Sequence, residues 1–403
     1  MNPRLTEESV QRFISEQSPA HVANLVFQPP IFEGIANAEI VYQLEAREKL
    51  RKKQPEWAET NGLLFAPPKA IEQCSSVFTA AYKAEVASIL VDGGTQKAVD
   101  LTAGFGVDTH AISKNFSTVI AVEKDAHLAE LSSHNFKQLN ALNIEVRTAS
   151  AETYLAEMTQ VDFLFLDPDR RDEAGTKHIG FEYYAPNIIE QYASLLGKAR
   201  LIGIKVSPMI DLSYAKKHLP DLFRVDLISV ENELKELVLW LSREPQSNQI
   251  KLVHAFLFKH KPTQLIEETA EGIDPFDKPL LPFEEANYLI DPAAAFVKSR
   301  RFNSLFKRYP ELHFANHSSY LLTAKEAVQG IPGRLFQIEE LIPYSKKNLK
   351  RFSSNAFSVQ VKGRKQRADE VRKALNLKES ETEFLFLVGS APGLIIRATK
   401  VNN

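Results

Sequence analysis

Residues 97–125 contain a β-α-β unit with a glycine-rich turn after its first strand. Residues 98–101 form a short apolar run, which is typical of a buried strand, and the turn that follows reads Thr-Ala-Gly-Phe-Gly. A helix is predicted over residues 107–114 and a β-branched strand over residues 118–122. Because ligands bind at the carboxyl ends of strands in open parallel sheets, this turn is the first candidate binding site.

The residues around the turn predict a nucleoside as the ligand. Glycine has no Cβ, so Gly104 and Gly106 allow a close approach of the backbone and a positive φ. Glu123 ends the second strand, where its carboxylate can accept hydrogen bonds from two ribose hydroxyls. A dinucleotide fingerprint would have a third glycine at Thr109, and the lysine of a triphosphate-binding loop is missing. The alternative is a turn whose glycines are purely structural.

This pattern, Asp-x-Thr-Ala-Gly-x-Gly with an acid at the end of the next strand, resembles motifs I and II of class I S-adenosylmethionine (SAM) methyltransferases. The resemblance implies that SAM binds here and leaves as S-adenosylhomocysteine, without a metal. A third strand is predicted over residues 144–148. In these enzymes the loop after the third strand commonly faces the adenine, although Glu152 in that loop can equally be an acid at a helix N-terminus. The implied cofactor-binding residues are Asp100, Thr102, Ala103, Gly104, Gly106, Asp108, Glu123, Lys124, Ala151, Glu152 and Asp167.

A helix predicted over residues 77–90 directly precedes the first strand. The segment ahead of motif I often covers the cofactor in the resembled enzymes, which makes Gln73, Ser75 and Ser76 candidates for contacts with cofactor or substrate. Serine at this place can equally cap the helix. Cys74 is expected to be a buried small residue rather than a nucleophile, because no histidine or other base lies near it in the sequence.

The fourth predicted strand, residues 161–166, runs into Asp-Pro-Asp-Arg-Arg-Asp. Methyltransferases of amino groups and bases often have (Asp/Asn)-Pro-Pro-aromatic here, where the acid binds the target nitrogen and the ring stacks on the base. Asp167 and Pro168 match this pattern, whereas Arg170 and Arg171 replace the aromatic residue. We expect these four residues to be the catalytic set, with the arginines binding a phosphate-bearing or acidic substrate or orienting Asp167. The alternative for the arginines is an internal ion-pair cluster.

Three further strands are predicted at residues 199–208, 225–230 and 236–241, and residues 251–259 form another β segment. Seven strands with helices between them match the Rossmann-like α/β sheet of class I methyltransferases. Lys205 lies at the carboxyl end of the fifth strand. It is expected to neutralise a substrate phosphate or to pair with Asp167.

From about residue 262 the composition changes to an α+β pattern with a local excess of positive charge. Residues 341–373 contain ten Lys or Arg and two Asp or Glu, whereas the whole chain has a formal net charge of −2. Cations of this kind bind RNA phosphates without regard to sequence, and a solvated helix face is the alternative. The residues expected to hold RNA are Lys346, Lys347, Lys350 and Arg351. Asp291 and Pro292 predict the N-cap and first residue of a helix.

Three parts are therefore expected: a helical region (residues 1–75), a methyltransferase domain (76–261) and an α+β domain (262–403). The chain resembles a bacterial family of class I SAM-dependent methyltransferases with a C-terminal THUMP-like domain. The motifs that carry this resemblance are Gln-Cys-Ser-Ser, the glycine turn, Asp-Pro-Asp-Arg-Arg, and Pro332-Gly-Arg in the last part. THUMP domains occur in RNA-modifying enzymes and bind tRNA or related RNA. The resemblance thus implies methylation of an RNA base, in tRNA or rRNA.

Composition limits the remaining alternatives. A single cysteine excludes an internal disulfide and a cysteine zinc site, and no apolar run reaches the roughly 18 residues of a membrane span. The first residues include acids and lack an apolar signal core, so we expect a cytoplasmic protein. Two other functions stay open: a small-molecule methyltransferase with a structural C-terminal lid, and a catalytically silent SAM-binding scaffold. The sequence specifies no oligomeric state.

Overall fold

The computed structural model describes residues 2–17, 22–91, 96–169, 180–244, 249–269, 278–316, 318–389 and 393–402. The chain forms two compact units. The N-terminal unit comprises Met1–Asp226 and Glu236–Asn248, and the C-terminal unit comprises Leu227–Lys235 and Gln249–Asn403. The three-part division at residues 75 and 261 stays a prediction.

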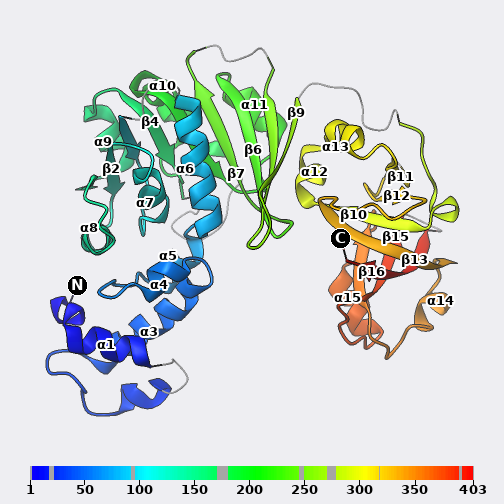
Figure 1. Cartoon of the computed structure of the whole chain (residues 1–403), viewed down its shortest axis with the longest axis horizontal. Coiled ribbons are helices and arrows are strands. Elements are labelled where there is room, and N and C mark those ends of the chain that lie inside the picture. Colours follow the sequence, from blue (N-terminus) through cyan, green and yellow to red (C-terminus); the bar gives the residue numbers. More distant parts are fainter. Residues whose placement is uncertain are drawn as a thin grey trace. The chain divides into compact units, whose positions relative to one another are not determined.

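The N-terminal unit begins with short helices, α1 (Glu8–Glu16), α3 (Asn37–Arg51), α4 (Pro55–Glu59) and α5 (Pro68–Gln73) (Figure 1). The buried guanidinium of Arg47 in α3 joins them, because it donates hydrogen bonds to carbonyl oxygens of α1 at 3.0 Å and of α4 at 2.6 Å. Asn135 exchanges two hydrogen bonds with the backbone of Leu64, which ties this region to α8 (Ala126–Gln138). Trp57 packs edge-on against Phe105, with 5.2 Å between the ring centroids. The helical region therefore supports the glycine turn.

A nine-stranded mixed sheet has the order β3-β2-β1-β4-β5-β7-β6-β8-β9. Its strands are β1 (Lys97–Asp100), β2 (Thr118–Glu123), β3 (Ile144–Thr148), β4 (Val161–Leu166), β5 (Ala199–Val206), β6 (Leu222–Val230), β7 (Glu233–Ser242), β8 (Lys251–Leu257) and β9 (Gln264–Thr269). Strands β1 to β5 pair in parallel, and β7 is antiparallel to β5. The predicted Rossmann-like sheet is confirmed, and β8 and β9 extend it.

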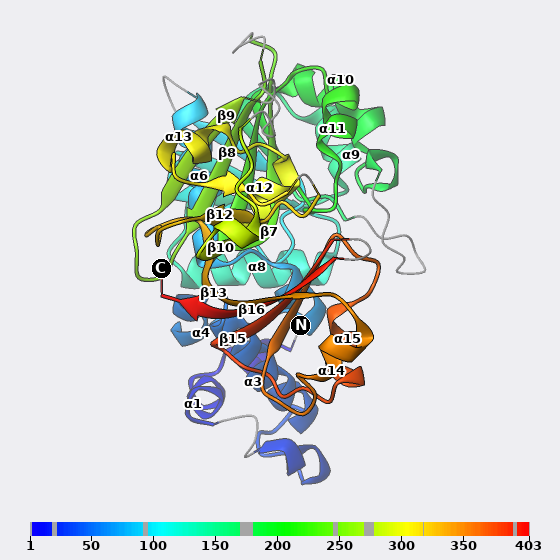
Figure 2. The ribbon, with the colours of Figure 1, turned by 90° about the vertical axis from the view of Figure 1, so that its right-hand side faces the viewer.

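Helices cover both faces of this sheet. Helix α6 (Val77–Val91) packs on α7 (Val107–Ser113), β4 and β5, while α9 (Ala151–Glu157) packs on α10 (Ile188–Lys198). Figure 2 shows α9, α10 and α11 (Leu212–His218) together on one side of the sheet and α6 on the other. β1 and β4 are buried between these layers, as their apolar runs predict. No helix in the described parts of the chain is both long and apolar enough to cross a membrane.

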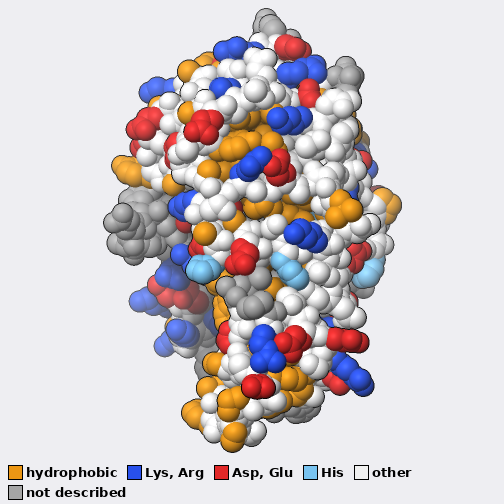
Figure 3. Space-filling view, turned by 90° about the vertical axis from the view of Figure 1, so that its left-hand side faces the viewer, with side chains coloured by type: hydrophobic (Ala, Val, Ile, Leu, Met, Phe, Trp, Pro, Cys, Tyr) orange, Lys and Arg blue, Asp and Glu red, His pale blue; other side chains and the backbone are white. Residues whose placement is uncertain are grey.

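The face of the N-terminal unit drawn in Figure 3 carries acidic and basic side chains interspersed with one another. The basic side chains of the described residues form no continuous surface in this view. Apolar side chains reach the solvent around the 3-10 helix η2 (Ala23–Phe27), where Phe27 is 88% exposed.

The C-terminal unit has its own seven-stranded sheet in the order β11-β12-β10-β13-β16-β15-β14. Its strands are β10 (Tyr288–Pro292), β11 (His313–Phe314), β12 (Leu322–Ala324), β13 (Gly333–Pro343), β14 (Ser358–Lys362), β15 (Glu383–Val388) and β16 (Leu394–Val401). Neighbouring strands are antiparallel, except that β14 and β15 are parallel. The unit also contains α12 (Ala294–Ser299), α13 (Asn303–Arg308), α14 (Lys346–Lys350) and α15 (Ala368–Ala374). The predicted α+β architecture is confirmed.

The predicted N-cap at Asp291 is wrong. Asp291 and Pro292 are the last residues of β10, and α12 begins only at Ala294. The Asp291 carboxylate instead lies 2.6 Å from the side-chain nitrogens of both Arg334 and Lys362. Two cations from distant parts of the chain thus replace the local helix N–H groups that the sequence suggested as its partners.

Candidate functional site

Gly104 and Gly106 of the turn are needed for different structural reasons. Gly106 has a φ of +90°, and a Cβ there would lie 2.5 Å from Cζ of Phe136, so α8 can pack here only against glycine. Gly104 has a φ of +56°, and the nearest atom to its Cβ position is the carbonyl oxygen of Thr102 at 3.9 Å. Gly106 therefore allows packing, whereas Gly104 leaves an open face.

Glu123 is fixed against that open face at the end of β2. One oxygen of its carboxylate accepts a hydrogen bond from the Gly104 N–H at 2.9 Å, and the other accepts from the Asp125 N–H at 2.8 Å. Ser132 of α8 holds the turn from the other side, because its hydroxyl donates to the Gly104 carbonyl oxygen at 3.0 Å. Each carboxylate oxygen can accept a further hydrogen bond, so the carboxylate can bind a ligand's hydroxyl groups.

Asp100 is buried beneath the turn at the end of β1. Its carboxylate accepts hydrogen bonds from the Thr102 N–H at 3.1 Å and from the Thr109 hydroxyl at 2.7 Å. Burial raises the pKa of Asp100 to about 7, although both hydrogen bonds oppose this change. Thr109, where a dinucleotide fingerprint has glycine, thus serves as the buried donor that holds Asp100.

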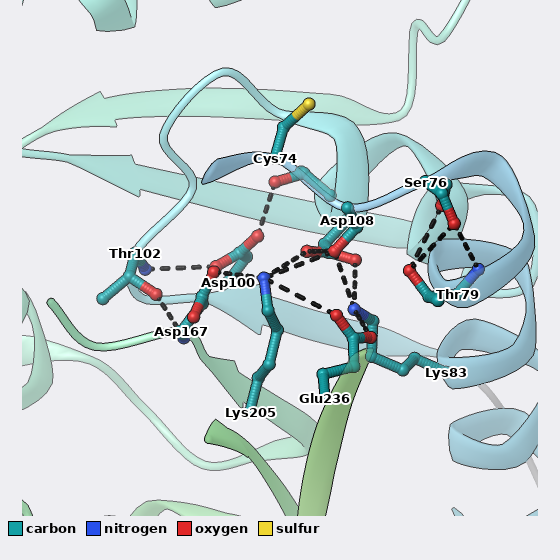
Figure 4. A network of polar contacts seen from close by, with 12 residues as sticks. Cys74, Ser76, Thr79, Lys83, Asp100, Thr102, Asp108, Asp167, Lys205 and Glu236 are labelled. Atoms are coloured by element: carbon teal, nitrogen blue, oxygen red, sulfur yellow. Dashed lines mark hydrogen bonds and ion pairs between the residues drawn. The ribbon is translucent and has the colours of Figure 1, made fainter. Parts of the chain in front are cut away.

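A buried network of charged side chains lies beside the turn (Figure 4). Lys83 Nζ is 3.0 Å from Asp108 Oδ1 and 2.5 Å from Glu236 Oε1. It also donates to Ser75 Oγ at 2.8 Å, and this hydroxyl donates to Asp108 Oδ2 at 2.8 Å. Burial acts to raise the pKa of Asp108, but the charges of Lys83 and Lys205 outweigh it and lower that pKa. Asp108 is therefore ionised and enclosed by its partners.

Lys205 connects this network to Asp167 at the end of β4 (Figure 4). Its Nζ lies 2.5 Å from Asp167 Oδ2, so it pairs with this acid, one of its two expected roles. Burial acts to lower the pKa of Lys205, but Asp167, Glu236 and Asp108 together raise it, so Lys205 stays protonated. The backbone N–H of Asp167 donates to the Thr102 hydroxyl at 2.6 Å. The Asp167 side chain is 36% exposed, which makes it the accessible end of the network.

The residues after Asp167 are held by a β-bridge. Pro168 is buried, and Asp169 exchanges backbone hydrogen bonds with Ala185 at 2.8 and 3.2 Å. Arg170 and Arg171 lie outside the described residues.

The candidates ahead of the first strand separate into two groups. Ser75 is part of the buried network, whereas Ser76 accepts a hydrogen bond from the Thr79 N–H at 3.3 Å, as a helix cap does. Gln73 is exposed at the end of α5. Cys74 is half-buried, and burial raises the pKa of its thiol to about 11, which keeps it protonated at neutral pH.

Three predicted cofactor residues lie after β2 and β3. Lys124 is exposed directly after Glu123. Ala151 is buried as the first residue of α9, and Glu152 is exposed in its first turn. Ser150 caps this helix by accepting a hydrogen bond from the Thr153 N–H at 3.1 Å.

The predicted RNA-binding cations lie on and just after α14 in the C-terminal unit. Lys346, Lys347, Lys350 and Arg351 are all exposed. Arg351 pairs with Glu340 at 3.3 Å, and no carboxylate of the described residues lies within 4.0 Å of the three lysines. The positive charge of these lysines is therefore available to a ligand.

Two charged residues of the network were not predicted. Lys83 interrupts an apolar helix, and Glu236 begins an apolar run in β7, so each is an isolated charge in a buried element. Such a residue needs a partner, and this is the sequence signal that identifies them. Among the described residues, no group of three or more His, Cys, Asp or Glu side chains could hold a metal ion.

Comparisons with known proteins agree with this architecture. Residues 333–399 match the family described as THUMP domain-like. A putative methyltransferase from Porphyromonas gingivalis W83 has a TM-score of 0.81 at 23% identity, and the match covers 100% of both chains. The chain therefore has a class I methyltransferase fold followed by a THUMP-like domain.

Other solved structures match only part of the chain. The human methyltransferase 10 domain containing protein has a TM-score of 0.38 at 14% identity, covering 51% of this chain and 97% of that one. A putative RNA methyltransferase from Pyrococcus horikoshii has a TM-score of 0.35 at 14% identity, covering 48% and 97%. These two similarities are too low to support an argument. No curated protein sequence matches the chain.

Proposed function

We propose that this chain, with its class I methyltransferase fold and C-terminal THUMP-like domain, is a SAM-dependent methyltransferase that modifies an RNA base in the cytoplasm. The observation that carries the proposal is the Glu123 carboxylate, which is fixed against the open face of Gly104. This is the arrangement that a ribose with two free hydroxyls requires.

The charges beside the turn fit the same cofactor. When bound, SAM supplies a methyl group on a positively charged sulfonium. The network has three carboxylates, Asp108, Asp167 and Glu236, against the two ammonium groups of Lys83 and Lys205. This excess of negative charge favours a cationic ligand. Thr102, Ala103, Gly104 and Gly106 would line the cofactor at the turn, with Ala151 and Glu152 on its adenine side.

Asp167 would position the methyl acceptor. Lys205 and the Thr102 hydroxyl hold Asp167 at the mouth of the site, and its exposed carboxylate can accept a hydrogen bond from an amino group or ring nitrogen of a base. Fixing the nitrogen in line with a methyl donor removes much of the entropic barrier to transfer. Arg170 and Arg171 would bind neighbouring phosphates, and Gln73 is a further candidate for a substrate contact.

The exposed cations of α14 would hold the RNA. Lys346, Lys347 and Lys350 have no carboxylate partner among the described residues, and lysines of this kind contribute affinity that does not depend on sequence. The THUMP-like domain would thus bring the RNA, and the methyltransferase fold would provide the chemistry.

The ribose assignment is tested by isothermal titration with SAM and S-adenosylhomocysteine. Replacing Glu123 by Ala should weaken both ligands roughly tenfold to a hundredfold, because charge-assisted hydrogen bonds are lost. Glu157→Ala, an exposed acid at the end of α9, is the matched control and should bind as the wild type does. Equal affinities for Glu123→Ala and the wild type would show that Glu123 does not hold the ribose.

Methyl transfer is tested with radiolabelled SAM and total bacterial RNA. At saturating SAM, Asp167→Asn should reduce incorporation roughly a hundredfold because the acceptor is no longer held, with a much smaller loss of SAM affinity from the missing carboxylate charge. Asp169→Asn is the control, since Asp169 is exposed and its β-bridge to Ala185 is made by backbone atoms, which the substitution leaves in place. SAM binding without incorporation into any RNA fraction by the wild type would favour the scaffold function instead.

A further inference from the structure

The motif Pro332-Gly333-Arg334 opens β13 and brings Arg334 against Asp291 of β10. Gly333 has a φ of +144°, and a Cβ there would lie 2.6 Å from the Asp291 carbonyl oxygen and 3.0 Å from Pro292 Cα. The glycine therefore permits a close approach of two strands. As a result Arg334 Nη2 donates to Asp291 Oδ2 at 2.6 Å.

A second cation reaches the same carboxylate from another strand. Lys362 is the last residue of β14, which is separated from β10 by β13, β16 and β15 in the order of the sheet. Its Nζ nevertheless donates to Asp291 Oδ1 at 2.6 Å. One buried carboxylate thus holds a guanidinium and an ammonium group beside each other.

This triad has more positive charge than its structural role requires. One cation is sufficient to neutralise Asp291, and the second repels the first, so placing both there has an electrostatic cost that a bound anion would offset. Most donors remain available, because Arg334 and Lys362 have no other hydrogen-bond acceptor among the described residues. Both side chains are accessible, at 36% and 26% exposure respectively.

The guanidinium also has an apolar support. Its carbon lies 5.7 Å from the ring centroid of Phe336 and 5.6 Å from that of Phe384. Both rings are buried, so they restrict the orientation of Arg334. The planar guanidinium of Arg334, which has a fixed orientation, and the adjacent ammonium group of Lys362 together suit a phosphate group.

We propose that Arg334 and Lys362 form a phosphate-binding site for the backbone of the RNA substrate. The proposal rests on the proposed function, and it adds to α14 a site of a different kind. The α14 lysines are exposed charges that raise affinity, whereas the pair on Asp291 has fixed donors that set where one phosphate lies. Both residues fall within the part of the chain that matches the THUMP-like family.

Fluorescence anisotropy of a labelled RNA hairpin and of total tRNA, measured on the full chain over a range of salt, tests this site. Arg334→Gln and Lys362→Gln should each weaken binding about threefold to tenfold, and should reduce the slope of log K against log salt by roughly 0.7 to 0.9. Lys235→Gln is the control, because Lys235 at the start of β7 is an exposed cation paired with Glu233 at 2.6 Å and lies outside the basic region of residues 341–373. Inorganic phosphate at constant ionic strength should compete with RNA for the wild type, and less for Arg334→Gln.

Lys362→Gln keeps Asp291 paired with Arg334, so this variant tests the site even if Arg334→Gln does not fold. Folded variants that bind RNA with the wild-type affinity and salt slope would overturn the proposal, while SAM binding and methyl transfer would still support the proposed function. A wild type that binds SAM but no RNA would overturn both this site and the RNA part of that function. A wild type that binds RNA through these residues but does not bind SAM would support this site and overturn the proposed cofactor.

Discussion

Lys83 is a cation enclosed in the interior of the N-terminal unit, where its ammonium group has Asp108 and Glu236 as ion-pair partners and Ser75 as an acceptor. A buried ion pair contributes little net stability compared with apolar residues of the same size, but losing one partner leaves an uncompensated charge. The role of Lys83 is therefore to balance the negative charge of two buried carboxylates close to the site.

Replacing Lys83 by Met should lower the free energy of unfolding by about 3–5 kcal/mol, because both carboxylates lose their nearest cation. Urea unfolding of the full chain measures this change. Lys137→Met, an exposed lysine of α8, is the control and should change stability by less than about 0.5 kcal/mol. Similar stabilities for the two variants would mean that Lys83 is dispensable to the network.

The network illustrates what the sequence could and could not predict at the level of single residues. Asp167, Lys205 and Ser75 were all expected near the site, because each lies at or beside the end of a predicted strand or helix. The pairing of Lys83 with Glu236 joins residues 153 positions apart, and no local pattern relates them. Only the order of the sheet, in which β7 lies next to β5, brings them together.

The glycine turn is the element on which the site depends, and its two glycines should respond differently to substitution. Gly106→Ala combines a positive φ with a clash against Phe136, so it should cost about 2–4 kcal/mol of stability. In Gly104→Ala the added Cβ would make only an ordinary contact with the Thr102 carbonyl oxygen at 3.9 Å, so the positive φ alone should cost about 1–2 kcal/mol. Chemical unfolding of both variants measures the difference. If the two alanines were equally destabilising, the close packing of α8 on the turn would not be what requires Gly106.

Elements stabilised by nearby residues were predictable, and those decided by distant ones were not. The β-α-β unit was predicted because apolar runs, a turn and a helix follow one another within thirty residues. The predicted helix cap at Asp291 is wrong for the opposite reason, since Asp291 belongs to β10 and its carboxylate is bound by Arg334 and Lys362, which are distant in sequence. Strand pairing in the C-terminal sheet thus outweighed the local Asp-Pro pattern, which predicts the start of a helix.

Over the whole molecule, the positive and negative charges nearly cancel, but they are unevenly distributed. The chain has a formal net charge of −2, yet α14 carries lysines without a carboxylate partner among the described residues, and a surplus cation lies at Asp291. The carboxylate excess is in the N-terminal unit. Each unit thus has a local charge opposite to that of its proposed ligand, the cationic cofactor in one and the RNA in the other.

The stability of the whole chain should also depend on a buried histidine. His254 of β8 stacks on Phe296 with 4.4 Å between ring centroids, and burial lowers its pKa to about 3. Between about pH 3 and the unfolded pKa of about 6.5, the unfolded chain binds one more proton at this residue, so stability rises with pH across that range. Replacing His254 by Phe should reduce that slope by up to about 1.4 kcal/mol per pH unit.

Urea unfolding at a series of pH values between 4 and 7 measures this slope (roughly the range in which the imidazole charges only when unfolded). His260→Gln is the control, because His260 is exposed. An unchanged slope in His254→Phe would contradict the assignment of a neutral, buried imidazole.

The hydrogen bond between the Asp167 backbone N–H and the Thr102 hydroxyl has a consequence for the order of events in a catalytic cycle. Thr102 belongs to the turn proposed to face the cofactor, and Asp167 is the acid proposed to face the acceptor, so this hydrogen bond connects the two proposed binding sites. We therefore expect a shift of the turn on SAM binding to change the position of the Asp167 backbone, so that SAM binds before the methyl acceptor.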